Sequence, residues 1–169
     1  SGTYTFTPDA GQCASPTTMT VTVNNPVTPN LSPVGPFCEN EATDVNLAAD
    51  VAGGSWSGTG VTDQTGIFNP SAAGVGTHTL TYTHTQGCGG TNTLAVVVNP
   101  VPSSAFTAAV TDGCSPLSVH FTSDPGVALA QWDFGDNTSA ATIGSADHVY
   151  NGAGTYAVSL TNTLNGCSS

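Results

Sequence analysis

Lys and Arg are both absent from this sequence of 169 residues, which contains 11 Asp and Glu and has a formal net charge of −11 at pH 7. Because neutralising phosphate groups requires Lys and Arg, this absence excludes nucleic-acid binding, P-loop nucleotide chemistry and binding to anionic membranes. It also excludes a Lys Schiff base, an arginine finger and an Arg clamp on a carboxylate. Only hydrolytic, metal-based or binding roles remain, and no enzyme class is favoured.

Long apolar runs are missing as well. No run approaches the roughly 18 residues of a membrane span, and residues 1–6 have neither the basic nor the apolar region of a signal peptide. We expect no membrane span in this segment, and its first residues are typical of the interior of a longer chain. Thr (27 residues), Gly (20) and Pro (11) are abundant, whereas the helix formers Glu, Lys and Arg are rare or absent. This composition predicts an all-β fold.

The sequence contains an internal repeat. Three segments begin with Gly-Thr and reach a Cys about a dozen residues later: Gly2–Cys13, Gly76–Cys88 and Gly154–Cys167. After the first two of these Cys comes a strand-like run, Thr17–Asn24 or Thr91–Asn99, and each run leads into a Pro. The repeat therefore combines a pair of strands with a Cys between them.

A second landmark precedes this strand pair in two of the copies. Cys38 and Trp56 are eighteen positions apart, and so are Cys114 and Trp132. The unit of about 75 residues thus runs Cys, Trp, Gly-Thr, Cys and closing strand, which is the order of landmarks in an immunoglobulin-like sandwich. We expect both Trp in the core of a sandwich, in preference to the alternative role of sugar-binding platforms.

This register predicts three parts. Residues 1–27 are expected to be the last two strands of a preceding Ig-like repeat, residues 28–100 a complete Ig-like repeat, and residues 101–169 a unit that lacks its last strand. The chain is interpreted as a window from a tandem array. The linkers 25–29 and 99–102 contain Pro, which restricts the backbone, so we expect stiff joints and an extended rod.

The five Cys are odd in number, and the repeat suggests how they are used. We expect Cys38 to pair with Cys88 and Cys114 with Cys167, while Cys13 has its partner before residue 1. Each bridge would close a loop of about 50 residues and contribute about 4 kcal/mol in the chain-entropy model. Disulfides would place the protein outside the reducing cytosol. Five free thiols are the alternative; a zinc site is disfavoured because the sequence has no C-x-x-C.

Four motifs in the last part are shared with a known family: Cys114–Phe121, Gln131–Asn137, His148–Tyr150 and Gly152–Leu160. The most specific is the run Trp132, Asp133, Phe134, Gly135 and Asp136. On these residues the segment 101–169 resembles a PKD domain, a β-sandwich module of cell surfaces and secreted bacterial enzymes. The predicted fold is therefore a tandem of antiparallel Ig-like and PKD β-sandwiches.

Residues 28–100 carry a second set of motifs: Cys38–Glu41, Gly54–Val61, Gly66–Pro70 and Gly74–His78. They are similar to Ig-like repeats in very large surface proteins of Bacteroidota, such as gliding and adhesion proteins exported by type IX secretion. The two resemblances imply a stalk or an adhesin, and they carry over no catalytic residue.

The acidic residues of the PKD-like motif are candidate calcium ligands. Asp133 and Asp136 lie close together in a chain without cationic partners, which suits a hard cation. The segment is not an EF-hand, because the twelfth position is Gly144, which has no carboxylate. The alternative is that the two side chains stabilise a turn by accepting backbone N–H groups.

A second acidic group contains Glu39, Glu41 and Asp44, which are interpreted as either a cation site or a solvated loop. Near matches to enzyme motifs fail: 53–57 does not complete G-x-S-x-G, and 58–63 does not complete G-x-G-x-x-G. We therefore expect a protein without catalytic activity or an obligatory cofactor.

The four His are expected to be structural. His78 and His84 share one face of a strand but lie about 20 Å apart, so that they cannot bind one metal ion. His120 and His148 lie in positions that match the PKD family and are interpreted as packing or hydrogen-bonding groups.

These observations predict a structural or adhesive segment of a long extracellular repeat protein. Its expected partners are neighbouring repeats of the same polypeptide, further copies in a fibre, and a surface or glycan ligand that the sequence does not name. One alternative is an accessory module pair of a secreted polysaccharide hydrolase or protease. A third is a filament in which Thr17–Asn24 of one chain completes the last unit of another.

Overall fold

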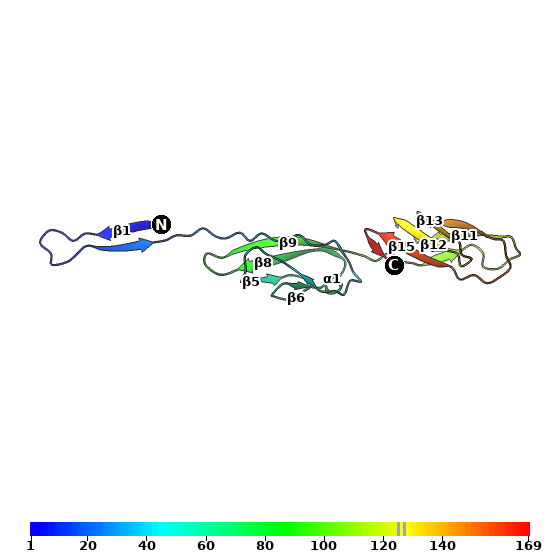
Figure 1. The fold of residues 1–169 in the computed structure, drawn as a ribbon, viewed down its shortest axis with the longest axis horizontal. Helices are drawn as coiled ribbons and strands as arrows, with labels where there is room; N and C mark the ends of the chain where they lie inside the picture. Colours follow the sequence, from blue (N-terminus) through cyan, green and yellow to red (C-terminus); the bar gives the residue numbers. More distant parts are fainter. Residues whose placement is uncertain (125, 127) are drawn as a thin grey trace.

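The computed structural model describes residues 1–124, 126 and 128–169. Its regular structure is almost entirely antiparallel β-sheet, which confirms the predicted all-β fold. Figure 1 shows a row of three parts: a β-hairpin, a central module (residues 29–99) and a C-terminal module (residues 103–169). Among the described residues, no helix has the length and apolar character needed to cross a membrane.

The hairpin consists of β1 (Gly2–Phe6) and β2 (Thr17–Val21), which pair antiparallel from Gly2 opposite Val21 to Phe6 opposite Thr17. The Thr-rich run that could be donated to another chain is therefore paired within its own hairpin. The hairpin leaves the side chain of Tyr4 exposed.

The central module consists of two sheets that enclose one core. The first sheet has the spatial order β3 (Phe37–Cys38), β9 (Gly90–Asn99), β8 (Gly76–His84) and β5 (Gly54–Ser57). The second has the order β4 (Val45–Asn46), β7 (Ile67–Phe68) and β6 (Val61–Asp63), and it is followed by the short helix α1 (Pro70–Ala73). Strand β3 pairs in parallel with the end of β9, whereas the other ladders are antiparallel.

Alternation along β8 and β9 builds the core of the central module. Leu80 and Tyr82 of β8 are buried, and the Thr residues that alternate with them face outward, as a half-buried strand requires. Trp56 of β5 is 2% exposed and lies opposite Tyr82, with ring centroids 5.1 Å apart. The Tyr82 hydroxyl accepts a hydrogen bond from Gly54 N at 2.9 Å.

The C-terminal module repeats this plan with two further sheets. One has the order β10 (Phe106–Ala108), β11 (Leu117–Ser123) and β14 (Ala146–Tyr150). The other has the order β13 (Ser139–Thr142), β12 (Leu129–Asp133), β15 (Ser159–Leu164) and β16 (Cys167–Ser168).

An aromatic cluster forms the core of the C-terminal module. Trp132 is 1% exposed, and its ring lies 5.2 Å from Phe106 and 5.6 Å from Phe121. Its Nε1 donates to the carbonyl oxygen of Gly144 at 3.1 Å. Trp132 lies opposite Leu160 on β15 just as Trp56 lies opposite a β8 residue, so the two Trp occupy equivalent strands of the two modules.

Candidate functional site at the joint between the modules

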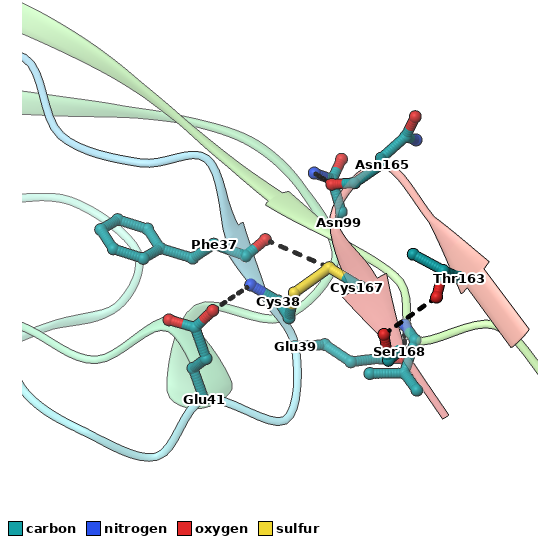
Figure 2. The surroundings of a disulfide bond; sticks show 10 residues. Phe37, Cys38, Glu39, Glu41, Asn99, Thr163, Asn165, Cys167 and Ser168 are labelled. Atoms are coloured by element: carbon teal, nitrogen blue, oxygen red, sulfur yellow. Dashed lines mark hydrogen bonds between the residues drawn. A yellow bond between two sulfur atoms is a disulfide. The ribbon is translucent and has the colours of Figure 1, made fainter. Parts of the chain in front are cut away.

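A disulfide bond joins the two modules. Cys38, the last residue of β3 in the central module, is bonded to Cys167, the first residue of β16 in the C-terminal module, across a sequence separation of 129. Figure 2 shows the bond between the end of β3 and the strand that follows the turn at Asn165. Because the bond connects residues on different sandwiches, it fixes how one module is joined to the next.

The disulfide pairing within modules that the repeat predicts is wrong. Cys38 lies beside Asn99, the last residue of β9, whereas Cys88 comes just before Gly90, the first residue of that strand. A strand of 10 residues holds its ends about 30 Å apart, and disulfide Cα atoms lie only about 4.4–6.8 Å apart. The central module therefore has its two Cys at opposite ends.

The same correction applies to the C-terminal module. Cys114 lies at the end opposite to Cys167. The neighbouring Ser115 donates to the carbonyl oxygen of Asn151, next to Tyr150, whose hydroxyl binds Phe134 near the start of β15, whereas Cys167 pairs with Leu164 at the end of β15. In the part of the chain that the structure describes, three Cys are unpaired and exposed: Cys13, Cys88 and Cys114.

Glu39 holds the linker beside this disulfide. Its backbone N–H donates to the carbonyl oxygen of Asn99 at 3.0 Å, and its carboxylate accepts from the N–H of Val101 at 2.9 Å. These two hydrogen bonds lie on either side of Pro100, which has no N–H of its own. The side-chain amide of Asn99 also donates to the carbonyl oxygen of Asn165 at 3.4 Å, across the joint. The joint is therefore closed by polar contacts as well as by the covalent bond.

The acidic group Glu39, Glu41 and Asp44 does not converge on one point. Glu41 accepts from the N–H of Cys38 at 3.1 Å, and Asp44 accepts from the side chain of Asn69 at 2.9 Å. Each carboxylate thus has a separate hydrogen-bonding partner. Within residues 1–124, 126 and 128–169, no group of three or more His, Cys, Asp or Glu has the geometry to hold a metal ion.

The joint between the hairpin and the central module has a similar layout. Val27 N donates to the carbonyl oxygen of Gly89 at 3.1 Å, and Cys88 Sγ lies 3.2 Å from the carbonyl oxygen of Asn24. Asn24 follows Cys13 at the same spacing as Asn99 follows Cys88. Cys88 therefore lies beside the end of the preceding strand pair.

The two Asp of the PKD-like motif stabilise a turn. Asp133 accepts from the N–H of Gly135 at 2.9 Å, and Asp136 accepts from the N–H of Thr138 at 3.1 Å. Gly135 and Asn137 have φ angles of 76° and 67°, in the left-handed region. These side-chain contacts stabilise a turn that contains two left-handed residues. Both carboxylates that were candidate calcium ligands therefore have hydrogen-bonding partners within the turn.

The turn is attached to the core through His148. Its Nε2 lies 2.8 Å from Asp136 Oδ2, and its ring stacks on Phe134 with centroids 4.1 Å apart. The Tyr150 hydroxyl donates to the carbonyl oxygen of Phe134 at 3.0 Å. The hydrogen bond from Thr138 and, after it, the contact with His148 hold the pKa of Asp136 below its ordinary value. Burial raises the pKa of Tyr150.

Asp136→Asn is expected to destabilise the C-terminal module at neutral pH, by less than a core substitution does. A lowered pKa means that folding favours the ionised carboxylate, so its contribution is complete at neutral pH and is lost as the pH falls through that lowered value. The difference in melting temperature between the wild type and D136N should therefore shrink as the pH falls below 3.8, the ordinary pKa of Asp. Circular dichroism melts at several pH values measure this difference.

Asp147→Asn is the control, because Asp147 pairs with His120 on an exposed surface. An equal effect of both variants would contradict the role assigned to Asp136.

The two His of the central module lie apart. His78 Nε2 is 2.8 Å from the carbonyl oxygen of Gly74, and His84 is buried at the end of β8. His84 lies opposite Gly90 on β9, at the end of the sheet where the hairpin is joined.

The C-terminal module leaves one edge of β15 paired over only two residues. Strand β15 pairs with β12 along one edge, and with the short β16 only through Thr163 and Leu164 on the other. Apolar side chains of β10, β11 and the segment 150–158 line a cavity of about 490 Å³, among them Phe106, Val119 and Val158.

The fold and the joint place the chain among proteins built from β-sandwich modules, here linked by a disulfide. Comparison with protein families finds a PKD domain at residues 97–169, so that the match begins in the last part of β9. PKD is a family of non-catalytic domains that are typically extracellular. No curated protein matches the chain.

Proposed function

We propose that this chain is a non-catalytic structural segment of a long extracellular repeat protein, in which it holds successive β-sandwich modules in a fixed row. The PKD domain suggests an extracellular structural or adhesive module. A disulfide between modules also suits an oxidising compartment, because cytosolic thiols are kept reduced.

The observation that carries this proposal is the covalent joint between the modules. A flexible linker would allow each module to turn freely. Here Cys38 is bonded to Cys167, and Glu39 binds the backbone on both sides of Pro100. These contacts reduce the freedom of one module to turn relative to the next. A stalk requires such a fixed joint, and the residues of the joint form no catalytic arrangement.

The finer parts of the proposal draw on the internal repeat, on the composition and on the resemblance to surface repeats of Bacteroidota. We infer that neighbouring repeats of the same polypeptide are the first partners and that rods of this kind associate laterally in a surface fibre. A surface with a net charge of −11 and no Lys or Arg would need divalent cations to bridge neighbouring rods. Export by type IX secretion and adhesion to a surface, which the resemblance to Bacteroidota surface repeats implies, belong to the same proposal.

Small-angle X-ray scattering tests the rod, and a pull-down tests the main alternative. The oxidised chain is expected to keep one maximum dimension from low to high salt, because a covalent joint is not screened by ions. It should not be retained on insoluble cellulose, chitin or peptidoglycan. Retention on one of these glycans would instead favour an accessory module of a secreted hydrolase. A maximum dimension that varies with salt would contradict the rigid joint.

A further inference from the structure

The segment Val27–Cys38 runs along the whole length of β9. At its start, Val27 N donates to the carbonyl oxygen of Gly89, just before β9 begins. At its end, Cys38 lies opposite Asn99, the last residue of β9, in a parallel pair. The segment and the strand therefore begin and end side by side.

The segment has almost no slack. The segment from Val27 to Cys38 contains about eleven residue-to-residue steps. The neighbouring stretch that runs to the end of β9 covers the same distance in about ten steps, each about 3.4 Å long in a fully extended strand. Contacts along the way hold it to the module: Leu31 forms a β-bridge with Ala49, and the ring of Phe37 lies 5.9 Å from that of Phe68. Val27 also passes so close to Gly90 that a Cβ there would collide with the Val27 carbonyl oxygen.

The disulfide continues this extended segment into the C-terminal module. Tension that enters at Val27 reaches Cys38 along this segment and then crosses to Cys167. The residues between Cys38 and Cys167, which form nearly all of both sandwiches, lie outside that path. We propose that Val27–Cys38 and the Cys38–Cys167 bond form a tension-bearing strap, which carries load past residues 39–166 of the two β-sandwiches.

This inference rests on the proposed function, since only a structural segment is under load. Its mechanical consequence is large. Without the bond, tension would pass through the linker at Pro100 and through both folded modules in series. Unfolding them would release a chain of sequence separation 129, about 450 Å when extended. With the bond in place, module unfolding cannot lengthen the chain.

The first joint has the same arrangement, which suggests how straps would follow one another in an array. Cys88 lies beside Asn24 at one end of the central module, and Cys114 lies at the far end of the C-terminal module. A neighbouring module of the same design would place a Cys38-type residue near Cys88 and a Cys167-type residue near Cys114. Straps from Cys13 to Cys38 and from Cys88 to Cys114 would then alternate along the rod.

Force spectroscopy on the chain of residues 1–169, held by its two ends, tests the strap. The oxidised chain is expected to lengthen only by the residues outside the loop, including the hairpin, which unzips in every variant. Cys38→Ser, or the wild type in reductant, should add stepwise gains that total about 450 Å. Cys88→Ser is the matched control and should behave as the wild type. Module-sized gains in the oxidised wild type would overturn the proposal.

A lengthened strap tests whether the segment is taut. Six Gly and Ser residues inserted between Ser32 and Pro33 should allow about 20 Å of additional extension at low force, while the fluorescence of both Trp stays native. The same low-force extension in the wild type would show a slack strap and contradict the proposal. Neither result depends on glycan retention, so failure of the strap and failure of the proposed function can be told apart.

Discussion

Replacing Cys38 with Ser is expected to destabilise both modules, each by about 4 kcal/mol. When one module unfolds and the other remains folded, the Cys38–Cys167 bond closes a loop of roughly 60–70 residues in the unfolded part. In the chain-entropy model this loop lowers the conformational entropy of the unfolded state and so stabilises the folded module. A loss of about 4 kcal/mol is large beside the total stability of about 5–15 kcal/mol of a small domain. A bond within one module would stabilise that module alone.

The two Trp allow the modules to be followed separately. Trp56 reports on the central module and Trp132 on the C-terminal module, so urea unfolding is measured in Trp132→Phe and Trp56→Phe backgrounds respectively. Both transitions should move to lower urea on Cys38→Ser, and neither should move on Cys88→Ser, which removes an exposed free thiol. A shift of one transition only would contradict the joint between modules.

Trp132→Ala is expected to cost the C-terminal module about 3–5 kcal/mol and to leave it largely unfolded. The ring contacts Phe106 and Phe121 at the centre of a small core, and its Nε1 donates to a backbone carbonyl. Truncation leaves a cavity that strands held by their ladders cannot fill.

The central module provides the control for this substitution. Its core is separate, so Trp56 in the Trp132→Ala variant should keep its native fluorescence, although its transition should move because the disulfide no longer ends on a folded partner. Trp132→Phe, which keeps an aromatic ring, should cost less than half as much. Simultaneous loss of both modules in the Ala variant would show a single cooperative unit and contradict two separate cores.

The sequence was sufficient to predict the fold because local patterns decide it. Alternation of Thr with apolar residues over 77–84 places Leu80 and Tyr82 on one face of a strand, whatever the strand pairs with. The motif around Trp132 likewise contains its own turn, since Asp133 and Asp136 bind backbone groups only two residues away. Such features depend on neighbours in sequence, so they can be predicted without a tertiary structure.

The disulfide could not be predicted from spacing, because a repeat places equivalent Cys in every module and does not show whether they pair within a module or with the next module. The deciding quantity is the end of the sandwich at which each Cys lies. One signal was available: Cys88 comes just before a closing strand, and a strand of 10 residues is too long for the other Cys to be close to both of its ends. Locating Cys38 still required the parallel pairing of β3 with β9, which is a tertiary contact.

The role of Glu39 was also beyond sequence reasoning. In sequence it lies in an acidic loop far from the linker, and its contact with Val101 joins residues 62 positions apart. Only the placement of β3 beside the end of β9 brings the two together.

A non-reducing peptide map tests the account most directly, because the covalent joint underlies the proposed stalk, the strap and the stability predictions. Pepsin at low pH is suitable, since trypsin has no Lys or Arg to cleave and acid suppresses thiolate exchange. We expect one pair of disulfide-linked peptides, which contains Cys38 and Cys167. Cys13, Cys88 and Cys114 should be open to alkylation. Peptides that link Cys38 to Cys88, or Cys114 to Cys167, would contradict the account.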